Sequence, residues 1–138
     1  MKSILFNLLR KIPHTVINDE CAPTLGPLLF RWFLFRSPWV TVMLHCFLRS
    51  DNDRAFHDHP WDFISFLLTP YVEHTPYGVF EHKRFSIVMR PAEWRHWVET
   101  LHPKTWTLVV HFRRRRVWGF ITASGWISWR NYVGDRCQ

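Results

Sequence analysis

The stretch WVTVMLHCFLRSDNDRAFHDHPWDF, residues 39–63, decides the fold. Its first half, residues 39–50, is rich in valine and aromatic side chains, a composition typical of a β-strand. A polar turn follows, and residues 54–59 then read as a second, shorter strand that ends at Pro60. The stretch therefore predicts a β-rich fold in which strands follow one another through tight, polar turns.

The rest of the chain repeats this pattern, with turn signals at Pro70, Pro76-Tyr77-Gly78 and Pro91. The expected strands are residues 28–35, 39–50, 54–59, 62–75 with a break at Pro70, 78–89, 93–100, 105–123 and 125–133. Many short strands at such spacing predict an all-β antiparallel barrel, and at this length a jelly roll or double-stranded β-helix. We expect a short helix near residues 2–11. We divide the chain into this helix with a loop-like wrap, residues 1–27, and a barrel domain, residues 28–138.

Size and composition are those of one globular domain. The chain has 138 residues, and 47% of them are hydrophobic, which excludes a disordered segment. Its three cysteines are odd in number and widely spaced, so we expect no disulfide framework and a reducing, cytoplasmic location. Charged residues interrupt both apolar stretches, at Arg10 and Lys11 and again at Arg31 and Arg36, so we predict no membrane span. The net charge of +7 allows anionic partners without choosing among them.

Two histidines in the opening stretch are candidate metal ligands. Residues two apart on a strand point to the same face, about 7 Å apart at Cα, so His57 and His59 project side by side. His96, which follows the turn at Pro91, is the best third ligand because an antiparallel barrel can return it beside them. The alternative is that these histidines form only ordinary hydrogen bonds, because an HxH pair arises by chance more often in a chain with nine histidines. Neutral imidazoles suit Fe, Zn, Ni, Cu or Mn, and composition does not choose among these metals.

Two motifs resemble those of the cupin family. HDHPWD at residues 57–62 resembles the first cupin motif, and PAEWRH at residues 91–96 resembles the second, with Glu93 in place of a glycine. The resemblance covers most of residues 39–123. It implies a cupin barrel and a metal held by His57, His59 and His96.

The chain departs from cupins at the acidic ligand. The usual spacing falls on Phe63 or Ile64, which cannot bind a metal. Asp62 lies close to that position and is a candidate fourth ligand, and Glu73 is a weaker alternative. The sequence is therefore compatible with a site of three histidines and with a mixed site of histidines and one carboxylate.

A three-histidine site resembles the cysteine-dioxygenase branch of cupins. That branch also has HDH followed by H-x-V-E, as this chain has at residues 57–59 and 96–99. The branch carries a further histidine near the pocket, to which His111 corresponds. A closer resemblance links LHCFLRSDNDRAFHDHPW at residues 44–61, with HWVE, WTL, WGF and GW further on, to small cupin-like proteins of bacteria and phages. That resemblance implies no particular reaction.

Several other polar residues have a functional and a structural interpretation. Arg49 and Arg54 are candidate substrate-binding residues that hold an anionic group, or else part of a polar turn. His45 and His111 are candidate catalytic acids or bases, or else satisfied core histidines. Asp58 points away from the metal, so we expect it to bond to the backbone or to an arginine.

The basic run at residues 113–116 allows nucleic-acid binding, which we do not favour because alternate arginines on a strand face opposite sides. The tryptophans at 118, 126 and 129 serve as core cover or as the face of a homodimer.

The sequence favours a metal-dependent enzyme of the oxygenase type that acts on a small anionic molecule. Fe(II) is the favoured metal, with Zn, Ni or Mn as alternatives. Two other functions remain open: a metal-dependent isomerase or lyase, and a non-enzymatic binding protein for an anionic ligand such as a nucleotide or sugar.

Overall fold

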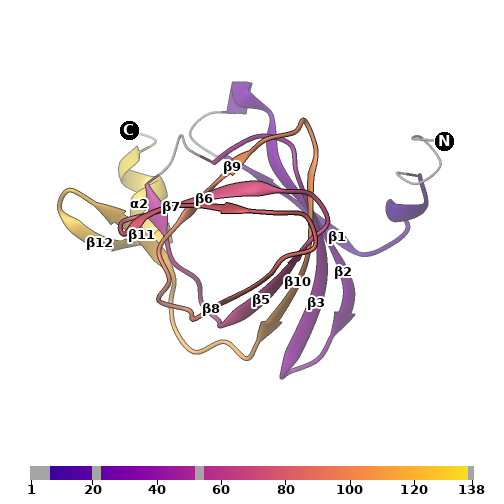
Figure 1. Ribbon diagram of the computed structural model, residues 1–138. Coiled ribbons are helices and arrows are strands. Elements are labelled where there is room, and N and C mark those ends of the chain that lie inside the picture. The colour runs from indigo at the N-terminus through magenta and orange to yellow at the C-terminus, as the bar shows by residue number, and fades with distance from the viewer. Residues whose placement is uncertain (1–6, 20–22, 52–54, 137–138) are drawn as a thin grey trace.

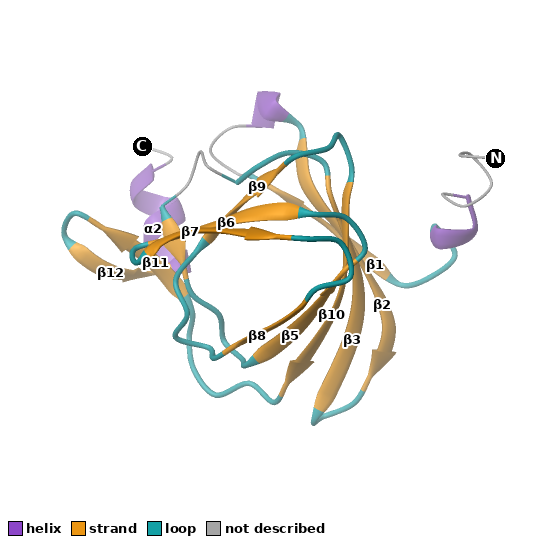
Figure 2. Ribbon diagram, viewed as in Figure 1, coloured by secondary structure: helices purple, strands orange, loops and turns teal. Residues whose placement is uncertain are grey.

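The structure is a computed structural model that describes residues 7–19, 23–51 and 55–136. Strands dominate it and curl into a barrel (Figures 1 and 2). The strands are β1 (His14–Asn18), β2 (Pro27–Arg36), β3 (Val40–Phe47), β4 (Phe56–His57), β5 (Phe63–Leu67), β6 (Tyr71–Thr75), β7 (Gly78–His82), β8 (Ile87–Arg90), β9 (Trp97–Thr100), β10 (Thr105–Phe112), β11 (Gly119–Thr122) and β12 (Gly125–Ser128). The helical segments with defined bounds are the 3-10 turn η1 (Pro23–Leu25) and α2 (Trp129–Arg136).

Three antiparallel sheets form two walls of the barrel. The large sheet has the strand order β1-β2-β3-β10-β5-β8 and makes one wall. The other wall combines the C-terminal sheet, β12-β11-β4, with the third sheet, β7-β6-β9. These two smaller sheets meet where the backbones of His57 and His96 form an isolated bridge. The predicted all-β double-stranded β-helix is therefore confirmed.

Alternation along the strands separates the inside of the barrel from the outside. On β10, Thr105, Thr107 and Val109 are buried, whereas the residues between them are half-buried. The inner core includes one cluster of Met43, Phe63 and Val109 and a second cluster of Leu67, Tyr71, Val88 and Val98. Outside the large sheet, Leu9 of the N-terminal segment packs on Trp32 and Cys46.

Several sequence expectations need adjustment. The expected strand at 78–89 is two strands, β7 and β8, which belong to different sheets. Of the helix expected near residues 2–11, residues 7–9 are helical, and residues 1–6 lie outside the described part. Within the expected wrap, residues 14–18 form β1, which pairs with β2. The expected strand at 105–123 is two strands, because residues 113–118 leave the large sheet before β11 begins.

The last expected strand, 125–133, ends at Ser128 and gives way to α2. The hydroxyl of Ser128 accepts a hydrogen bond from the backbone N–H of Asn131 at 3.5 Å, which is how an N-cap residue starts a helix. Among the described residues, helices are too short to cross a membrane.

Candidate metal centre

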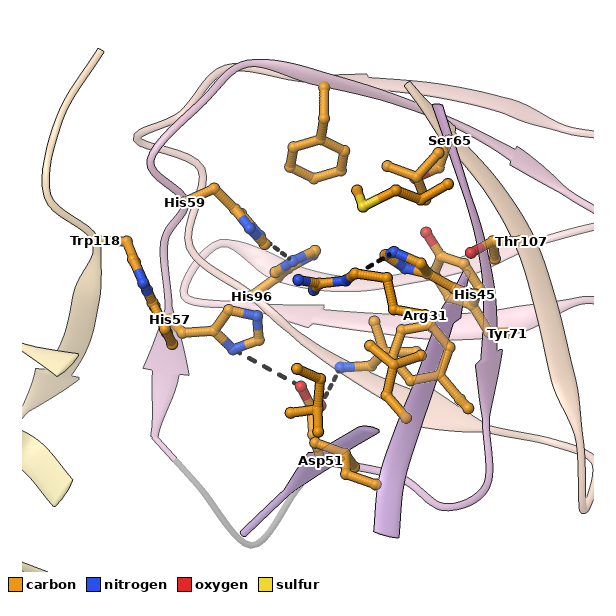
Figure 3. A pocket seen from close by; sticks show the side chains of 18 of the residues that line it. Arg31, His45, Asp51, His57, His59, Ser65, Tyr71, His96, Thr107 and Trp118 are labelled. Carbon is orange, nitrogen blue, oxygen red and sulfur yellow. Dashed lines mark hydrogen bonds and ion pairs between the residues drawn. The ribbon is translucent and has the colours of Figure 1, made fainter. Parts of the chain in front are cut away.

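Three histidines from two sheets meet at one end of the barrel interior. His57 ends β4, His59 follows two residues later, and His96 immediately precedes β9. One ring nitrogen from each lies within 4.8 Å of the others, and the three rings converge in Figure 3. The backbones of His57 and His96 exchange two N–H···O hydrogen bonds of 3.0 Å each. The pairing of the two backbones, and not the identity of the side chains, therefore sets the distance between these two residues.

The distances and protonation states of the cluster fit a metal ion. The Nε2 atoms of His59 and His96 are 2.9 Å apart. Two nitrogen ligands at right angles, each about 2.1 Å from one ion, lie about 3.0 Å apart. Burial, followed by the nearby His96, lowers the pKa of His59 well below its usual range, so this imidazole is neutral at pH 7. A neutral imidazole has the lone pair that a metal ligand needs.

His96 is oriented by a buried carboxylate. Its Nδ1–H donates to Glu73 Oε1 at 2.6 Å, which directs the other ring nitrogen, Nε2, at the cluster. Glu73 itself is fully buried and accepts further hydrogen bonds from Trp94 at 2.8 Å, His82 at 2.8 Å and Arg90 at 2.7 Å. Burial alone would raise the pKa of Glu73, but the hydrogen bonds from His96, Arg90 and His82 outweigh it and hold that pKa far below its usual value. Glu73 is therefore an anion that supports a ligand.

Asp51 supports the second face of the cluster. Its Oδ2 lies 3.7 Å from Nδ1 of His57, and its Oδ1 accepts the backbone N–H of Val98 at 2.5 Å. The carboxylate of Asp51 is almost fully buried. It thus links the strand after His96 to the ring of His57.

A cavity of about 210 Å³ opens beside the triad. Figure 3 shows the histidines on one side and the side chains of the large sheet on the other. The lining is Ile17, Leu28, Leu29, Arg31, Met43, His45, Phe47, Asp51, His57, His59, Pro60, Trp61, Phe63, Ser65, Tyr71, His96, Val98, Thr107, Val109 and Trp118. Its walls are mainly apolar, with a few polar groups that converge, as in small-molecule binding sites.

Arg31 brings a positive charge into this cavity. It interrupts the apolar run of residues 28–35 in strand β2, and its Nε donates to Nε2 of His45 at 3.2 Å. Burial lowers the pKa of Arg31 to about 10, which still leaves it protonated at pH 7. Burial and then the charge of Arg31 lower the pKa of His45 well below its usual range, so His45 is neutral. Within the described part of the chain, no carboxylate forms an ion pair with Arg31.

Asp62, the candidate fourth ligand, is not brought to the triad. Its Oδ1 accepts hydrogen bonds from the backbone N–H of Ala92 at 2.7 Å and from Arg115 at 2.6 Å, near the surface. These contacts, that of Ala92 first, lower the pKa of Asp62. The position expected to lack an acid is occupied by Phe63, whose ring lies 4.6 Å from that of His59. Among the described residues, the group that could hold a metal ion therefore consists of three histidines and no acid.

The remaining candidate residues divide into three groups. His45 lines the cavity, as a catalytic residue must. His111 and Arg49 do not line it: the ring of His111 stacks on Trp61 at 3.9 Å, and Nη1 of Arg49 donates to the carbonyl of Ser50. Arg54 lies outside the described residues.

Asp58, between the two histidines, fastens β4 to the C-terminal sheet. Its Oδ1 accepts the N–H of Gly119 at 2.7 Å, its Oδ2 accepts from Trp126 at 2.9 Å, and the same oxygen forms an ion pair with Nη1 of Arg116 at 2.8 Å. The expectation that Asp58 bonds to the backbone or to an arginine is confirmed, since it contacts both. Gly119 is required here, because a Cβ would overlap the carbonyl of Ile127.

The arginines at 113–116 lie in the connection after β10 rather than on a strand. Arg115 pairs with Asp62 and Glu93, and Arg116 pairs with Asp58. The carboxylate partners of Arg115 and Arg116 reduce the charge available to nucleic acid.

No protein-family model matches the sequence, and no curated protein is significantly similar to it. Solved structures are similar. A cupin-2 domain protein from Rhodospirillum rubrum superposes with a TM-score of 0.64 at 12% identity, over 83% of this chain and 78% of that one. A cupin superfamily protein from Silicibacter pomeroyi, described as a sugar phosphate isomerase, gives 0.62 at 13% identity, over 86% and 88%. KdgF from Halomonas sp. gives 0.59 at 13% identity, over 77% and 90%.

This chain has the cupin fold. The three histidines come from the two motifs that resemble those of cupins, residues 57–62 and 91–96. Sequence reasoning did not find Arg31 as a cavity residue. The signal was one charged side chain in the apolar run LLFRWFLF.

Proposed function

We propose that the protein is a metal-dependent enzyme of the oxygenase type that binds Fe(II) through the triad and acts on a small anionic molecule. The observation that carries the proposal is that His57, His59 and His96 face the same cavity as the Arg31 cation. Three neutral imidazoles would leave a bound Fe(II) its full charge and open positions, where it would bind a substrate heteroatom and activate oxygen.

We assign to Arg31 the binding of an anionic group, the role for which the sequence offers Arg49 and Arg54. Its guanidinium has a neutral partner, His45, rather than an acid among the described residues. A cation in an apolar cavity attracts a carboxylate or phosphate more strongly than one in water, because the local dielectric constant is low. Arg31 would therefore orient the anionic end of a substrate.

The size of the cavity favours a small substrate. A volume of about 210 Å³ corresponds to about seven water molecules at roughly 30 Å³ each. Met43, Phe63 and Val109 form an apolar part of its wall. A ligand with few non-hydrogen atoms and one anionic group fits both observations.

A metal-dependent isomerase or lyase is the second candidate. The observation in its favour is that His45 and Tyr71, groups that exchange protons, line the cavity. The similar structure described as a sugar phosphate isomerase has the same fold, which is compatible with this reaction class.

The proposal is tested by metal analysis of the purified protein. We expect about one Fe(II) per chain in the wild type, none in a His57→Ala, His59→Ala variant, and full occupancy in a His74→Ala control on the outside of the third sheet. A wild-type protein that binds no divalent metal at micromolar concentration would overturn the proposal.

The reaction class is tested with the metal-loaded protein and a panel of small carboxylates and phosphates. Oxygen consumption that depends on the substrate supports the oxygenase. Turnover that persists without oxygen favours the isomerase or lyase instead. Tight anion binding that survives His96→Ala, with no turnover, favours the non-enzymatic binding protein.

A further inference from the structure

The turn between β2 and β3 carries large apolar side chains that face solvent. Leu34 and Phe35, near the end of β2, are 46% and 56% exposed, and Trp39, just before β3, is 64% exposed. In Figure 1 this turn lies at the lower end of the barrel, next to the end of β10. Phe112 at that end of β10 pairs with Val40 and is 40% exposed. We name Leu34, Phe35, Trp39 and Phe112 the apolar tip.

Ser37 holds the turn in one conformation. Its hydroxyl oxygen accepts hydrogen bonds from the backbone N–H of Trp39 at 3.3 Å and from that of Val40 at 3.0 Å. Its own N–H donates to the carbonyl of Val40 at 2.9 Å. Pro38 has a fixed φ angle, which restricts the turn further. Because the turn is already ordered, the presentation of Trp39 to a partner costs little conformational entropy.

Arginines flank the apolar tip. The guanidinium of Arg36 lies 3.6 Å from the centre of the Phe33 ring, and that of Arg113 lies 5.1 Å from the centre of the Trp39 ring. Arg114 comes next along the chain and is exposed. We name Arg36, Arg113 and Arg114 the tip arginines. Within the described part of the chain, none of the three forms an ion pair with a carboxylate.

The balance of charge at this end of the barrel is positive. The backbone carbonyl of Asp62 accepts the N–H of Phe112, so this acid lies near the tip. Asp62 and Glu93 both contact Arg115, and the tip arginines outnumber the one acid that Arg115 does not neutralise. Exposed apolar side chains beside unpaired cations are complementary to a membrane with anionic lipids. The apolar side chains enter the boundary with the acyl chains, and the cations reach the phosphate groups.

Single-stranded nucleic acid is another anionic partner that arginines and aromatic rings can bind. Bases in such complexes stack on the flat faces of aromatic rings. One face of the Phe33 ring is covered by Arg36, and Leu34 has no ring on which a base could stack. A membrane accepts aliphatic and aromatic side chains alike. The composition of the apolar tip therefore favours a membrane.

A second arginine–tryptophan pair shows what is particular to the tip. The guanidinium of Arg130 lies 5.4 Å from the centre of the Trp129 ring on α2, close to the distance between Arg113 and Trp39. Trp129 is half-buried, however, and its ring stacks on that of Trp118. Little of the Trp129 ring could enter a membrane. Arg130 is therefore a matched control for Arg113.

We propose that the apolar tip and the tip arginines form a peripheral binding site for anionic phospholipid membranes. Trp39 and the other apolar side chains enter the interfacial layer, and the tip arginines contact lipid phosphates. None of these residues lines the cavity beside the triad. Membrane binding is therefore independent of the metal and of the reaction, so either proposal can fail without the other.

The test is co-sedimentation of the protein with vesicles of phosphatidylcholine, with or without about 30% phosphatidylserine, in about 0.1 M NaCl. We expect the wild type to bind the anionic vesicles at least about tenfold more tightly than the neutral ones. An arginine near an anionic surface contributes a factor of roughly five, so Arg36→Gln, Arg113→Gln should weaken binding about 20-fold. Trp39→Ser should weaken it on the order of tenfold, because less apolar surface is inserted.

Two control variants change similar side chains elsewhere. Arg130→Gln removes the matched arginine, and Tyr77→Ser removes an exposed aromatic side chain from the turn between β6 and β7. Both should bind the anionic vesicles as the wild type does. Circular dichroism and metal content should be the same in all variants, which separates a loss of binding from a loss of folding.

A wild-type protein that does not bind the anionic vesicles would overturn the proposal. Equal binding to neutral vesicles, or binding that either tip variant leaves unchanged, would do the same. A labelled single-stranded oligonucleotide that binds more tightly than the vesicles, and that Arg36→Gln, Arg113→Gln releases, would assign the surface to nucleic acid instead. Self-association that Trp39→Ser abolishes, measured by sedimentation velocity, would assign it to a second copy. Either of these last two results would also overturn the proposal.

Discussion

Two histidine–glutamate pairs on the third sheet have the same length and opposite surroundings. His96 donates to Glu73 inside the barrel, and His74 contacts Glu99 outside it, each at 2.6 Å. Glu73 and His74 are neighbours on β6, so their side chains leave the strand on opposite faces. The Glu73 side chain is fully buried, whereas 43% of the Glu99 side chain is exposed.

The two pairs differ in the other groups that contact them. Glu73 also binds Trp94, His82 and Arg90, so its charge is fixed in one place and holds His96 in one orientation. The outer pair instead has the ring of His74 stacked on Trp97 at 3.7 Å. The length of a hydrogen bond therefore does not reveal its role, whereas burial and the number of additional partners do.

Removing the histidine from each pair should produce the largest contrast. His96→Ala deletes one of three ligands, and a third of a typical metal-binding free energy of roughly 10 kcal/mol is on the order of a 300-fold loss of affinity. His74→Ala should leave affinity unchanged. Competition with a fluorescent chelator measures both. Equal effects in the two variants would contradict the assignment of the inner pair to the metal.

Removing the charge of each glutamate should have a smaller but still distinct effect. Glu73→Gln keeps the shape and removes the charge that orients His96, so metal affinity should fall about 10–100-fold. The metal-free variant should lose about 3 kcal/mol of stability, because Arg90 loses its buried partner. Glu99→Gln is the matched control. Titration of metal and urea unfolding of both variants measure the difference.

Lowering the pH should distinguish buried histidines from exposed ones. Burial lowers the pKa of His45 and of His59, whereas both titrate near 6.5 in the unfolded chain. The unfolded state therefore binds more protons below that value, and stability falls as the pH decreases from 7 to 5. We expect the metal-free protein to lose up to about 2 kcal/mol for each of the two rings over this interval in urea unfolding. His45→Gln should remove about half of this loss, and a flat wild-type profile would count against the buried neutral rings.

Salt should have the smallest effect, confined to the outer pair. The contact between His74 and the partly exposed Glu99 contributes at most about 1 kcal/mol, and 1 M NaCl screens the charge of Glu99. The stability difference between wild type and Glu99→Gln should therefore vanish at high salt. The larger difference for Glu73→Gln should persist, because the inner pair is shielded from ions. Unfolding curves at two salt concentrations make this comparison.

The fold and the triad were predictable because both depend on local rules. Strand alternation places His57 and His59 on one face, and the resemblance to two cupin motifs supplied His96. The absence of an acid at Phe63 was also visible from spacing. The placement of His57 and His59 needs no knowledge of which distant strands lie opposite one another, whereas that of His96 depended on the resemblance.

The contributions of Arg31 and Glu73 to the site depend on contacts across the barrel. Arg31 and His45 become neighbours only through the register of β2 with β3. Glu73 reaches His96 only through the pairing of β6 with β9. Asp62 illustrates the converse: it is close to the motif in sequence, yet a surface arginine engages it. Long-range register is therefore what separates a list of candidate residues from a site.

The backbone bridge between His57 and His96 fixes one side of the candidate site independently of the other side. The bridge sets the separation of these two ligands in the smaller sheets, while Arg31, His45 and Met43 project from the large sheet on the far side. Substitutions on the large sheet can therefore alter which molecule fits the cavity without disturbing the arrangement of the histidines. A scaffold arranged in this way can change its ligand by changing one wall at a time.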